Sequence, residues 1–489
     1  MTPVRRRRRT ALLLVVLALV ALGAGLLAGR GAGSGGPPAS ATLRLVPADA
    51  LVAVHVSTDR GRTATAAAAA RLAQRLPSWP RLQASVLRRL TARGCGIDLR
   101  RRPGRETVFA LLPGAGGVAS PLIVTDAPAK GLGDVSRPCG ALVARRVDGL
   151  VVIGQPAGVL AAQSAADGRA TSLANSPVYR RAASGLPSDR VADAWVSPQG
   201  ARRLLTPLGG ALGLIGSLLD ARGLRGVAAA LVPTDAGARV AVRRVVARGS
   251  GGAPFRATLH RLAPADTLAY VASGDLASTL QRLVVLAGPG AGRALPRLLA
   301  QGGVPLDTLG RLGRESAVVI APGESGPSLT LLARVQQPAR AQAAMRALEP
   351  ALATLAGAPA ETSFADAAPG GKPARTLAGA ATTGLTWAID GTTLIVGTTP
   401  AAVADARSHV GRLTATPAYR AVAGNVPNPI RSLVFLDPKN LLQLSEQTGI
   451  GPGAALQGVR GDLDRIRAVG AYSAGAGDVS TVDLSFSIP

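Results

Sequence analysis

The sequence predicts an α+β fold: two tandem homologous domains, with mainly antiparallel sheets and packed helices, that follow an N-terminal transmembrane helix. Three observations support this prediction. An apolar stretch follows a run of arginines at the N-terminus, short landmarks occur twice in the same order, and apolar runs alternate with alanine-rich segments of helical length. Strands that pair locally and are interspersed with helices are typical of the α+β class.

The first 30 residues are predicted to be a cytoplasmic arginine-rich tail and a transmembrane signal-anchor. Residues 5–9 are all arginine and precede an uncharged stretch at 10–29. As a helix, this stretch is long enough to span the roughly 30 Å hydrocarbon core of a bilayer. Only Arg30 stands on the other flank, so the asymmetry places the N-terminus in the cytoplasm and the rest of the chain outside.

The alternative to a retained anchor is a cleaved signal peptide. Residues 39–41 (Ala-Ser-Ala) would then be the small-residue cleavage site. The apolar region of a signal peptide is usually about 7–15 residues long, which is shorter than the stretch at 10–29, so the anchor is favoured. Residues 31–41 are rich in glycine, serine and proline, and they predict a flexible linker.

Two α+β repeats are predicted after this linker, at residues 42–248 and 255–489, with a short linker at 249–254. Pro-Ala-Asp-Ala-Leu at 47–51 returns as Pro-Ala-Asp-Thr-Leu at 264–268. Further landmarks recur in the same order: Gly-Arg-Glu at 104–106 and 313–315, Asp-Gly at 148–149 and 390–391, Pro-x-Tyr-Arg at 177–180 and 417–420, and Pro198 and Pro438. A period of about 200 residues is long enough for a domain and much longer than the repeats of solenoids.

The landmarks predict equivalent positions in the two repeats. The strands that begin near Leu51 and Leu268 should have equivalent neighbours in their sheets. Three pairs of side chains should also be equivalent and share the same burial: Asp49 and Asp266, Glu106 and Glu315, and Tyr179 and Tyr419. Because the junction at 249–254 is short and polar, we expect the repeats to meet through a modest interface and not an intertwined core.

In the first repeat, a strand at 43–57, with a turn at Pro47-Ala48-Asp49, is expected to precede a long helical region at 63–90. Pro77 and Pro80 interrupt that region, because proline breaks a helix interior. The elements that follow are strands at 107–112 and 121–125, a hairpin of 141–147 and 150–153, a helix at 157–166, a strand at 190–196 and a closing hairpin at 226–246. Asp148-Gly149 marks the first hairpin, since Asp-Gly between apolar runs is a strong turn signal.

The second repeat follows the same plan. Its hairpin of 385–389 and 392–396 is predicted to turn across Asp390-Gly391. The other predicted elements are helices at 275–287 and 293–300, strands at 316–320 and 328–335, a helix at 400–408, a strand at 432–436 and a closing hairpin at 468–487.

The formal net charge of +27 raises the question of an anionic partner. Basic surfaces that bind single-stranded nucleic acid interleave aromatic side chains for base stacking, whereas this chain has only 5 Phe, 4 Tyr and 3 Trp. We therefore predict no nucleic-acid partner. Solvated basic faces without a specific partner are the first interpretation, and attraction to anionic lipid or an anionic wall polymer is the second.

Cys95 and Cys139 are the two cysteines of the chain and form the disulfide candidate. Outside the cytoplasm, an even number of cysteines favours a disulfide. The alternative is two buried free thiols that pack as small apolar side chains. Neither interpretation gives the cysteines a catalytic role.

The repeated landmarks carry a resemblance to a known family. A Pro-Ala-Asp-x-Leu start before an apolar strand, then a helical region, an Asp, a Gly-x-Glu and a further strand, resemble the domain-of-unknown-function family 3352, a bacterial family of exported or membrane-anchored proteins. The resemblance covers nearly all of the chain after the linker, and it implies no known activity, cofactor or catalytic residue. Arg105 and Arg314 stand where an acidic residue is expected in that family.

The residues predict no catalytic, cofactor-binding or metal site. The three histidines of the chain are His55, His260 and His409. They are far apart in the sequence, and none has a second His or Cys at the spacing of zinc ligands. The glycines at 31–36 neither follow a strand nor open a helix, as a dinucleotide-binding loop does. Glu106 and Glu315 suggest either a pair of acids across the repeats or carboxylates at strand starts that bond to arginine or backbone.

These observations together predict a single-pass, membrane-anchored extracytoplasmic protein of the bacterial cell envelope. Its leading function is non-enzymatic binding or scaffolding. A carrier of a lipid-like or apolar ligand is the alternative, because alanine-rich helices over a sheet with few aromatics leave room for a cavity. A hydrolase with a dispersed site is the third possibility.

Overall fold

The computed structural model describes residues 41–57, 59, 62, 105–114, 118–126, 142–205, 223–234, 237–247, 253–274, 313–323, 326–359, 362–379, 384–408, 411–440, 443, 466–475 and 477–487. The predicted anchor at 1–30 and the predicted helices at 63–90, 275–287 and 293–300 lie outside the described residues, as do Cys95 and Cys139. Within these ranges, no helix is long and apolar enough to cross a membrane.

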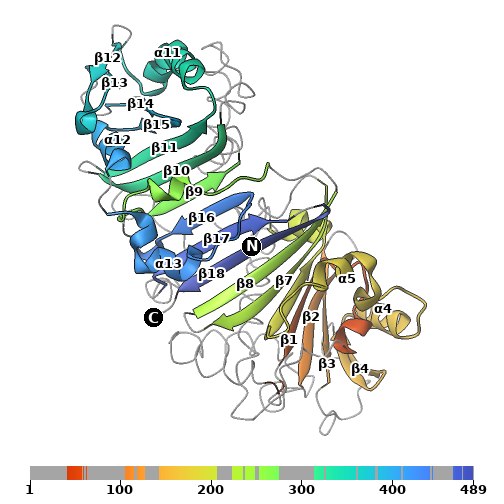
Figure 1. Cartoon of the computed structure of the whole chain (residues 1–489). Coiled ribbons are helices and arrows are strands. Elements are labelled where there is room, and N and C mark those ends of the chain that lie inside the picture. Colours follow the sequence, from red (N-terminus) through yellow and green to blue (C-terminus); the bar gives the residue numbers. More distant parts are fainter. Residues whose placement is uncertain are drawn as a thin grey trace.

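The strands form a single sheet of 18 strands, and every described ladder is antiparallel (Figure 1). With helices packed on it, the sheet confirms the predicted α+β class with mainly antiparallel pairing. The strands are β1 Val52–Ser57, β2 Glu106–Pro113, β3 Ala119–Thr125, β4 Val143–Val147, β5 Leu150–Gly154, β6 Ala192–Val196, β7 Leu224–Thr234, β8 Gly237–Val246, β9 Ala269–Ser273, β10 Gly313–Gly323, β11 Gly326–Val335, β12 Phe364–Ala367, β13 Ala374–Leu377, β14 Thr386–Asp390, β15 Thr393–Gly397, β16 Ser432–Leu436, β17 Ala468–Ala474 and β18 Val479–Ser487.

The strand order is the same on both sides of the seam between β8 and β18. Outward from β8 the order is β7, β6, β1, β2, β3, β5 and β4. Outward from β18 it is β17, β16, β9, β10, β11, β15 and β14, after which β13 and β12 are added. We call the strands β1–β8 the first half and the strands β9–β18 the second half.

The registers of the two halves also agree. Val52 on β1 lies opposite Leu111, and Ala269 on β9 lies opposite Ile320. β1 lies between β2 and β6, just as β9 lies between β10 and β16, so the strands near Leu51 and Leu268 have equivalent neighbours. Each of the three pairs of side chains has the same burial in both halves. Asp49 and Asp266 are exposed. Buried side chains make up the other two pairs, Glu106 and Glu315, and Tyr179 and Tyr419.

The seam joins the halves edge to edge. The β8–β18 ladder runs from Gly237 opposite Ser487 to Val245 opposite Val479, so the sheet is continuous across it. The apolar cores remain separate: one cluster holds only first-half side chains around Trp195, and two others hold only second-half side chains. The halves therefore share hydrogen bonds of one sheet while each half buries its own apolar side chains.

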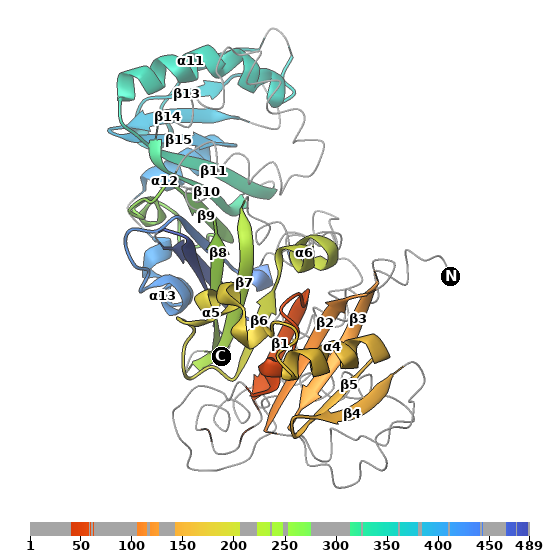
Figure 2. The same ribbon diagram turned by 90° about the vertical axis from the view of Figure 1, so that its right-hand side faces the viewer.

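Short helices cover the sheet at equivalent places in both halves (Figure 2). α5 packs on β7 and β8, and α13 packs on β17 and β18. The helices are α4 Pro156–Ala166, α5 Pro177–Ala183, α6 Pro198–Gly200, α11 Pro338–Leu355, α12 Pro400–Arg407 and α13 Pro417–Ala423, with the shorter turns η1 Ala41–Leu45, η3 Leu173–Asn175, η4 Ala201–Leu205, η6 Leu259–Arg261, η7 Pro369–Gly371 and η8 Leu413–Ala415.

The Ser/Thr-Pro-x-Tyr-Arg landmark has a simple structural cause. Ser176 caps α5 by accepting a hydrogen bond from the backbone N–H of Tyr179, and Thr416 caps α13 in the same way from Tyr419. Proline follows each cap at the first helical position, where its missing N–H is not needed. The tyrosines then point into the core, where they are 8% and 3% exposed.

Three sequence-based expectations need correction. The second hairpin turns across Gly391 and Thr392, and Asp390 is the last residue of β14, so the Asp-Gly landmarks are offset by one position. In the second hairpin only Gly391 has a positive φ, whereas in the first hairpin both Asp148 and Gly149 do. The two turns therefore differ in type. Of the strand expected at 43–57, only Val52–Ser57 is a strand, because residues 41–45 form a 3₁₀ helix and the expected turn lies at Ala48-Asp49. The third correction is that the second half has α11 and the β12–β13 hairpin, which have no counterpart among the described residues of the first half.

Candidate functional site

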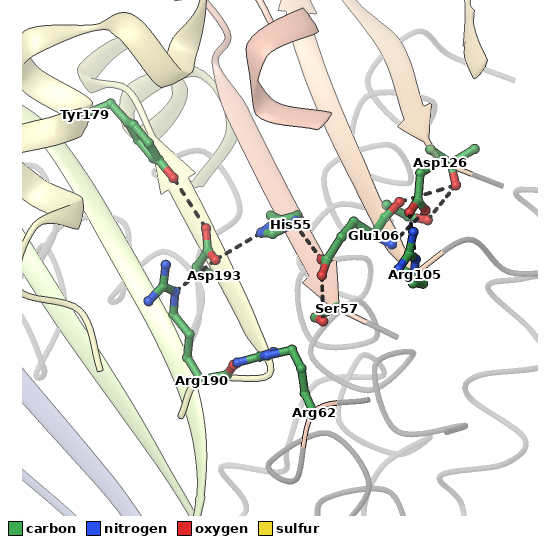
Figure 3. Close-up of polar contacts among 11 residues, drawn as sticks. His55, Ser57, Arg62, Arg105, Glu106, Asp126, Tyr179, Arg190 and Asp193 are labelled. Carbon is green, nitrogen blue, oxygen red and sulfur yellow. Dashed lines mark hydrogen bonds and ion pairs between the residues drawn. The ribbon is translucent and has the colours of Figure 1, made fainter. Parts of the chain in front are cut away.

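The most polar part of the described interior is a cluster on three neighbouring strands of the first half (Figure 3). His55 lies on β1, Glu106 opens β2 and Asp193 lies on β6. The registers bring them together, since His55 is opposite Asp193 while Glu106 is opposite Ser57, two residues further along β1. The three side chains are 2%, 3% and 4% exposed, so all of them are withdrawn from solvent.

His55 sits between two carboxylates. Its Nδ1 lies 3.1 Å from Asp193 Oδ1 and its Nε2 lies 2.9 Å from Glu106 Oε2. Burial by itself would lower the pKa of His55, but the charges of Asp193 and Glu106 and the hydrogen bonds they accept raise it to about 9. Near neutral pH both ring nitrogens therefore carry protons, and the imidazolium is a buried cation.

Asp193 receives three donors. Besides His55, Arg190 Nε donates to its Oδ1 over 3.1 Å and the Tyr179 hydroxyl donates to its Oδ2 over 3.5 Å. Burial would raise the pKa of Asp193, but His55 and then Arg190 outweigh it and hold the pKa below the usual value. The same burial, together with the charge on Asp193, raises the pKa of Tyr179, so the phenol stays protonated.

Glu106 forms hydrogen bonds with residues other than His55. Ser57 Oγ donates to Glu106 Oε1 over 2.9 Å, and the backbone N–H of Glu106 donates to Asp126 Oδ1 over 2.8 Å. Arg62 lies at the rim, where its guanidinium donates to the carbonyl oxygens of Ser188 and Arg190. The buried charges are thus compensated by one another and by hydrogen bonds, the condition under which a buried ion pair is tolerated.

This geometry differs from that of a nucleophile activated by a base. Such a pair needs the nucleophile within hydrogen-bond reach of a base that has a free lone pair. The Ser57 hydroxyl donates to Glu106, and no described contact joins it to His55. His55 carries protons on both nitrogens and turns each toward a carboxylate, so neither nitrogen is free to accept a proton or to bind a metal ion. Throughout the described part of the chain, no group of three or more His, Cys, Asp and Glu is arranged to hold a metal ion.

The second half keeps only one member of the cluster. Glu315 is equivalent to Glu106, but the registers place Ala272 where the first half has His55 and Leu433 where it has Asp193. Glu315 is 3% exposed and accepts hydrogen bonds from the backbone N–H groups of Thr258 and Leu259 over 2.7 and 2.8 Å. Burial raises the pKa of Glu315, and these hydrogen bonds oppose the rise.

The structure keeps apart the two acids that were considered as a pair. Eight strands separate β2, which begins with Glu106, from β10, which carries Glu315. At a strand spacing of about 4.8 Å, the two carboxylates are roughly 40 Å apart along the sheet. Each is a carboxylate near the start of a strand with local partners, and they form no common site.

The histidines also have separate surroundings. His260 stacks on Tyr419 with ring centroids 5.8 Å apart, and burial together with the charge of Arg261 lowers the pKa of His260 to about 4. His409 lies outside the described residues, as do Cys95 and Cys139. The sequence-based search missed Asp193 and Arg190, although an aspartate in the middle of an apolar strand was a usable signal.

Comparisons of the chain with protein-family models, with curated proteins and with solved structures found no match. The resemblance seen in the landmarks therefore stays a prediction.

Proposed function

We propose that this chain is a non-enzymatic binding or scaffolding protein of the bacterial cell envelope, held at the outer face of the membrane by its N-terminal segment. The observation that carries the proposal is that the reactive groups of the buried cluster are engaged with one another. Each ring nitrogen of His55 lies within 3.1 Å of a carboxylate oxygen, and the Ser57 hydroxyl donates to Glu106. We infer that the protein acts through its surfaces, because the groups of this buried cluster contact one another.

We further propose that the two halves arose by tandem duplication of one domain. Identical strand order and identical register in both halves support this origin.

Duplication suits a scaffold because it lengthens one continuous surface. The seam between β8 and β18 extends the sheet without a break, and strands run from β4 near one end to β12 near the other (Figure 1). The basic composition of the chain adds attraction to anionic lipid or wall polymer near the membrane, an attraction that salt weakens.

Native mass spectrometry of the detergent-extracted full chain tests the proposed function. Extraction follows mild in-cell crosslinking, and protease added to intact spheroplasts is the topology control. We expect the protein to stay with the membrane, its extracytoplasmic part to be digested, and the extracted chain to carry partner mass. A shortened soluble chain without partner mass, or turnover of an ester or peptide substrate that His55→Ala abolishes, would contradict the proposal.

A further inference from the structure

The outermost strand of the first half has one edge without a described partner: β4 pairs with β5 on one side, and no described strand pairs with its other side. In the second half the equivalent strand, β14, is covered: β13 pairs with it antiparallel, with Arg375 opposite Trp387 and Thr376 opposite Thr386. Among the described residues, the sheet therefore has an additional strand at this position in the second half only.

The backbone of β4 is prepared for such a strand. Asp148 and Gly149 form a two-residue turn with positive φ at both positions, and Val147 and Leu150 flank it as a hydrogen-bonded pair. Hydrogen-bonded and non-bonded pairs alternate along an antiparallel ladder. The N–H and C=O groups of Ala144 and Arg146 are therefore directed away from β5, toward the outer edge of the strand. Ala144 is equivalent to Trp387, the β14 residue that faces β13.

The side chains of β4 define which strand would fit. Arg145 and Arg146 are exposed, and neither forms an ion pair with a described residue. They point to opposite faces of the sheet because successive strand residues alternate. Two neighbouring acidic residues on an incoming strand would also point to opposite faces, so each would meet one arginine. A second copy of β4 would instead bring arginines together, and like charges directly opposite are unfavourable.

We propose that the outer edge of β4 is a docking site for an extended acidic segment of a partner protein, which adds to the sheet as an antiparallel strand. Strand addition to an open sheet edge is a common mode of peptide recognition, in which backbone hydrogen bonds provide affinity and side chains provide selectivity. This inference deepens the proposed function and rests on it, since it gives the scaffold a contact surface and a class of partner.

The test uses the full chain in detergent micelles and a fluorescent ten-residue peptide of β-branched residues around a central Glu-Glu pair. Fluorescence anisotropy reports binding. We expect the same peptide with Lys-Lys at its centre to bind at least about tenfold more weakly, and Arg145→Glu/Arg146→Glu to weaken the Glu-Glu peptide by a similar factor. The matched control is Arg340→Glu/Arg346→Glu on the exposed face of α11, which makes the same charge change and should leave binding unchanged.

A second pair of probes separates strand addition from simple charge attraction. N-methylation of alternate peptide residues removes the N–H groups on one edge of the peptide, so one methylated series should lose binding to β4 and the other series should keep it. Arg146→Pro removes an outward N–H of β4 and should bind far less peptide than Arg146→Ala. Equal binding by both methylated peptides, or loss of binding in the α11 control, overturns the docking site.

These outcomes are distinguishable from failure of the proposed function. If the extracted chain carries partner mass that Arg145→Glu/Arg146→Glu does not remove, and the peptide does not bind, the β4 site is wrong while scaffolding stands. If no partner mass is present with the wild-type chain, scaffolding itself is contradicted.

Discussion

The free energy of unfolding should decrease by about 3 kcal/mol between pH 6.5 and pH 9, because in this range the folded protein keeps a proton on His55 that the unfolded chain has already released. The pKa of His55 is raised from 6.5 to about 9 in the folded protein. A group with a raised folded pKa stabilises the fold fully below its unfolded pKa and loses that contribution as the pH rises through its folded pKa. One pH unit corresponds to about 1.4 kcal/mol per proton, and His55 is too buried for solvent to screen the effect.

Substitution within the cluster shows whether this pH dependence originates there. His55→Ala or Asp193→Leu alone leaves a buried charge without its partner, which costs about 3–5 kcal/mol. The double variant His55→Ala/Asp193→Leu reproduces the second half, which has Ala272 and Leu433 at these positions. It should cost less than the sum of the single variants, because the two residues are in direct contact.

The assay is denaturant unfolding of the full chain in detergent micelles, followed by tryptophan fluorescence at half-unit steps from pH 6 to pH 9.5. Trp195 is a suitable reporter, since its ring lies 5.7 Å from that of Tyr179, which bonds to Asp193. The double variant should lose the pH dependence that the wild-type chain has. An unchanged pH dependence in the double variant, or a cost equal to the sum of the single variants, would refute the reasoning.

Three further predictions concern other residues. Burial lowers the pKa of His260 to about 4. Its neutral ring therefore stabilises the fold above pH 6.5, and this contribution is lost as the pH falls toward 4. In the same unfolding assay, His260→Phe should remove that loss of stability in acid. Gly226→Ala should lower the free energy of unfolding by about 1–3 kcal/mol, because the added methyl group clashes with Trp195. Adding Trp195→Phe should restore part of that stability, and thermal unfolding of both variants would check this. Thiol labelling under denaturing, non-reducing conditions should find Cys95 and Cys139 unreactive, and two labelled thiols would exclude the disulfide.

Local elements could be predicted from the sequence because their causes are local. The β4–β5 hairpin follows from Asp148-Gly149, whose backbone suits a tight turn. The start of α13 follows from its threonine cap and the proline behind it. The strand predicted at 432–436 matches β16 for the same reason, since its apolar residues are bounded by turn signals on both sides.

The cluster and the seam could not be predicted because their causes are not local. His55 and Asp193 are 138 residues apart, and only the register of β1 against β6 brings them into contact. Pairing of β8 with β18 depends on how the two halves meet, which no sequence landmark encodes. The β12–β13 hairpin has no counterpart among the described strands of the first half, so comparison of the repeats gives no signal for it.

The most direct test of the central claim compares the wild-type chain with the folded double variant His55→Ala/Asp193→Leu. Both are crosslinked in cells, extracted in detergent and weighed by native mass spectrometry. If the buried cluster is structural and the protein acts through its surfaces, both chains carry the same partner mass. Loss of that partner mass from the double variant, in a chain that unfolds as cooperatively as the wild type, would make the cluster the working site and contradict the proposed function.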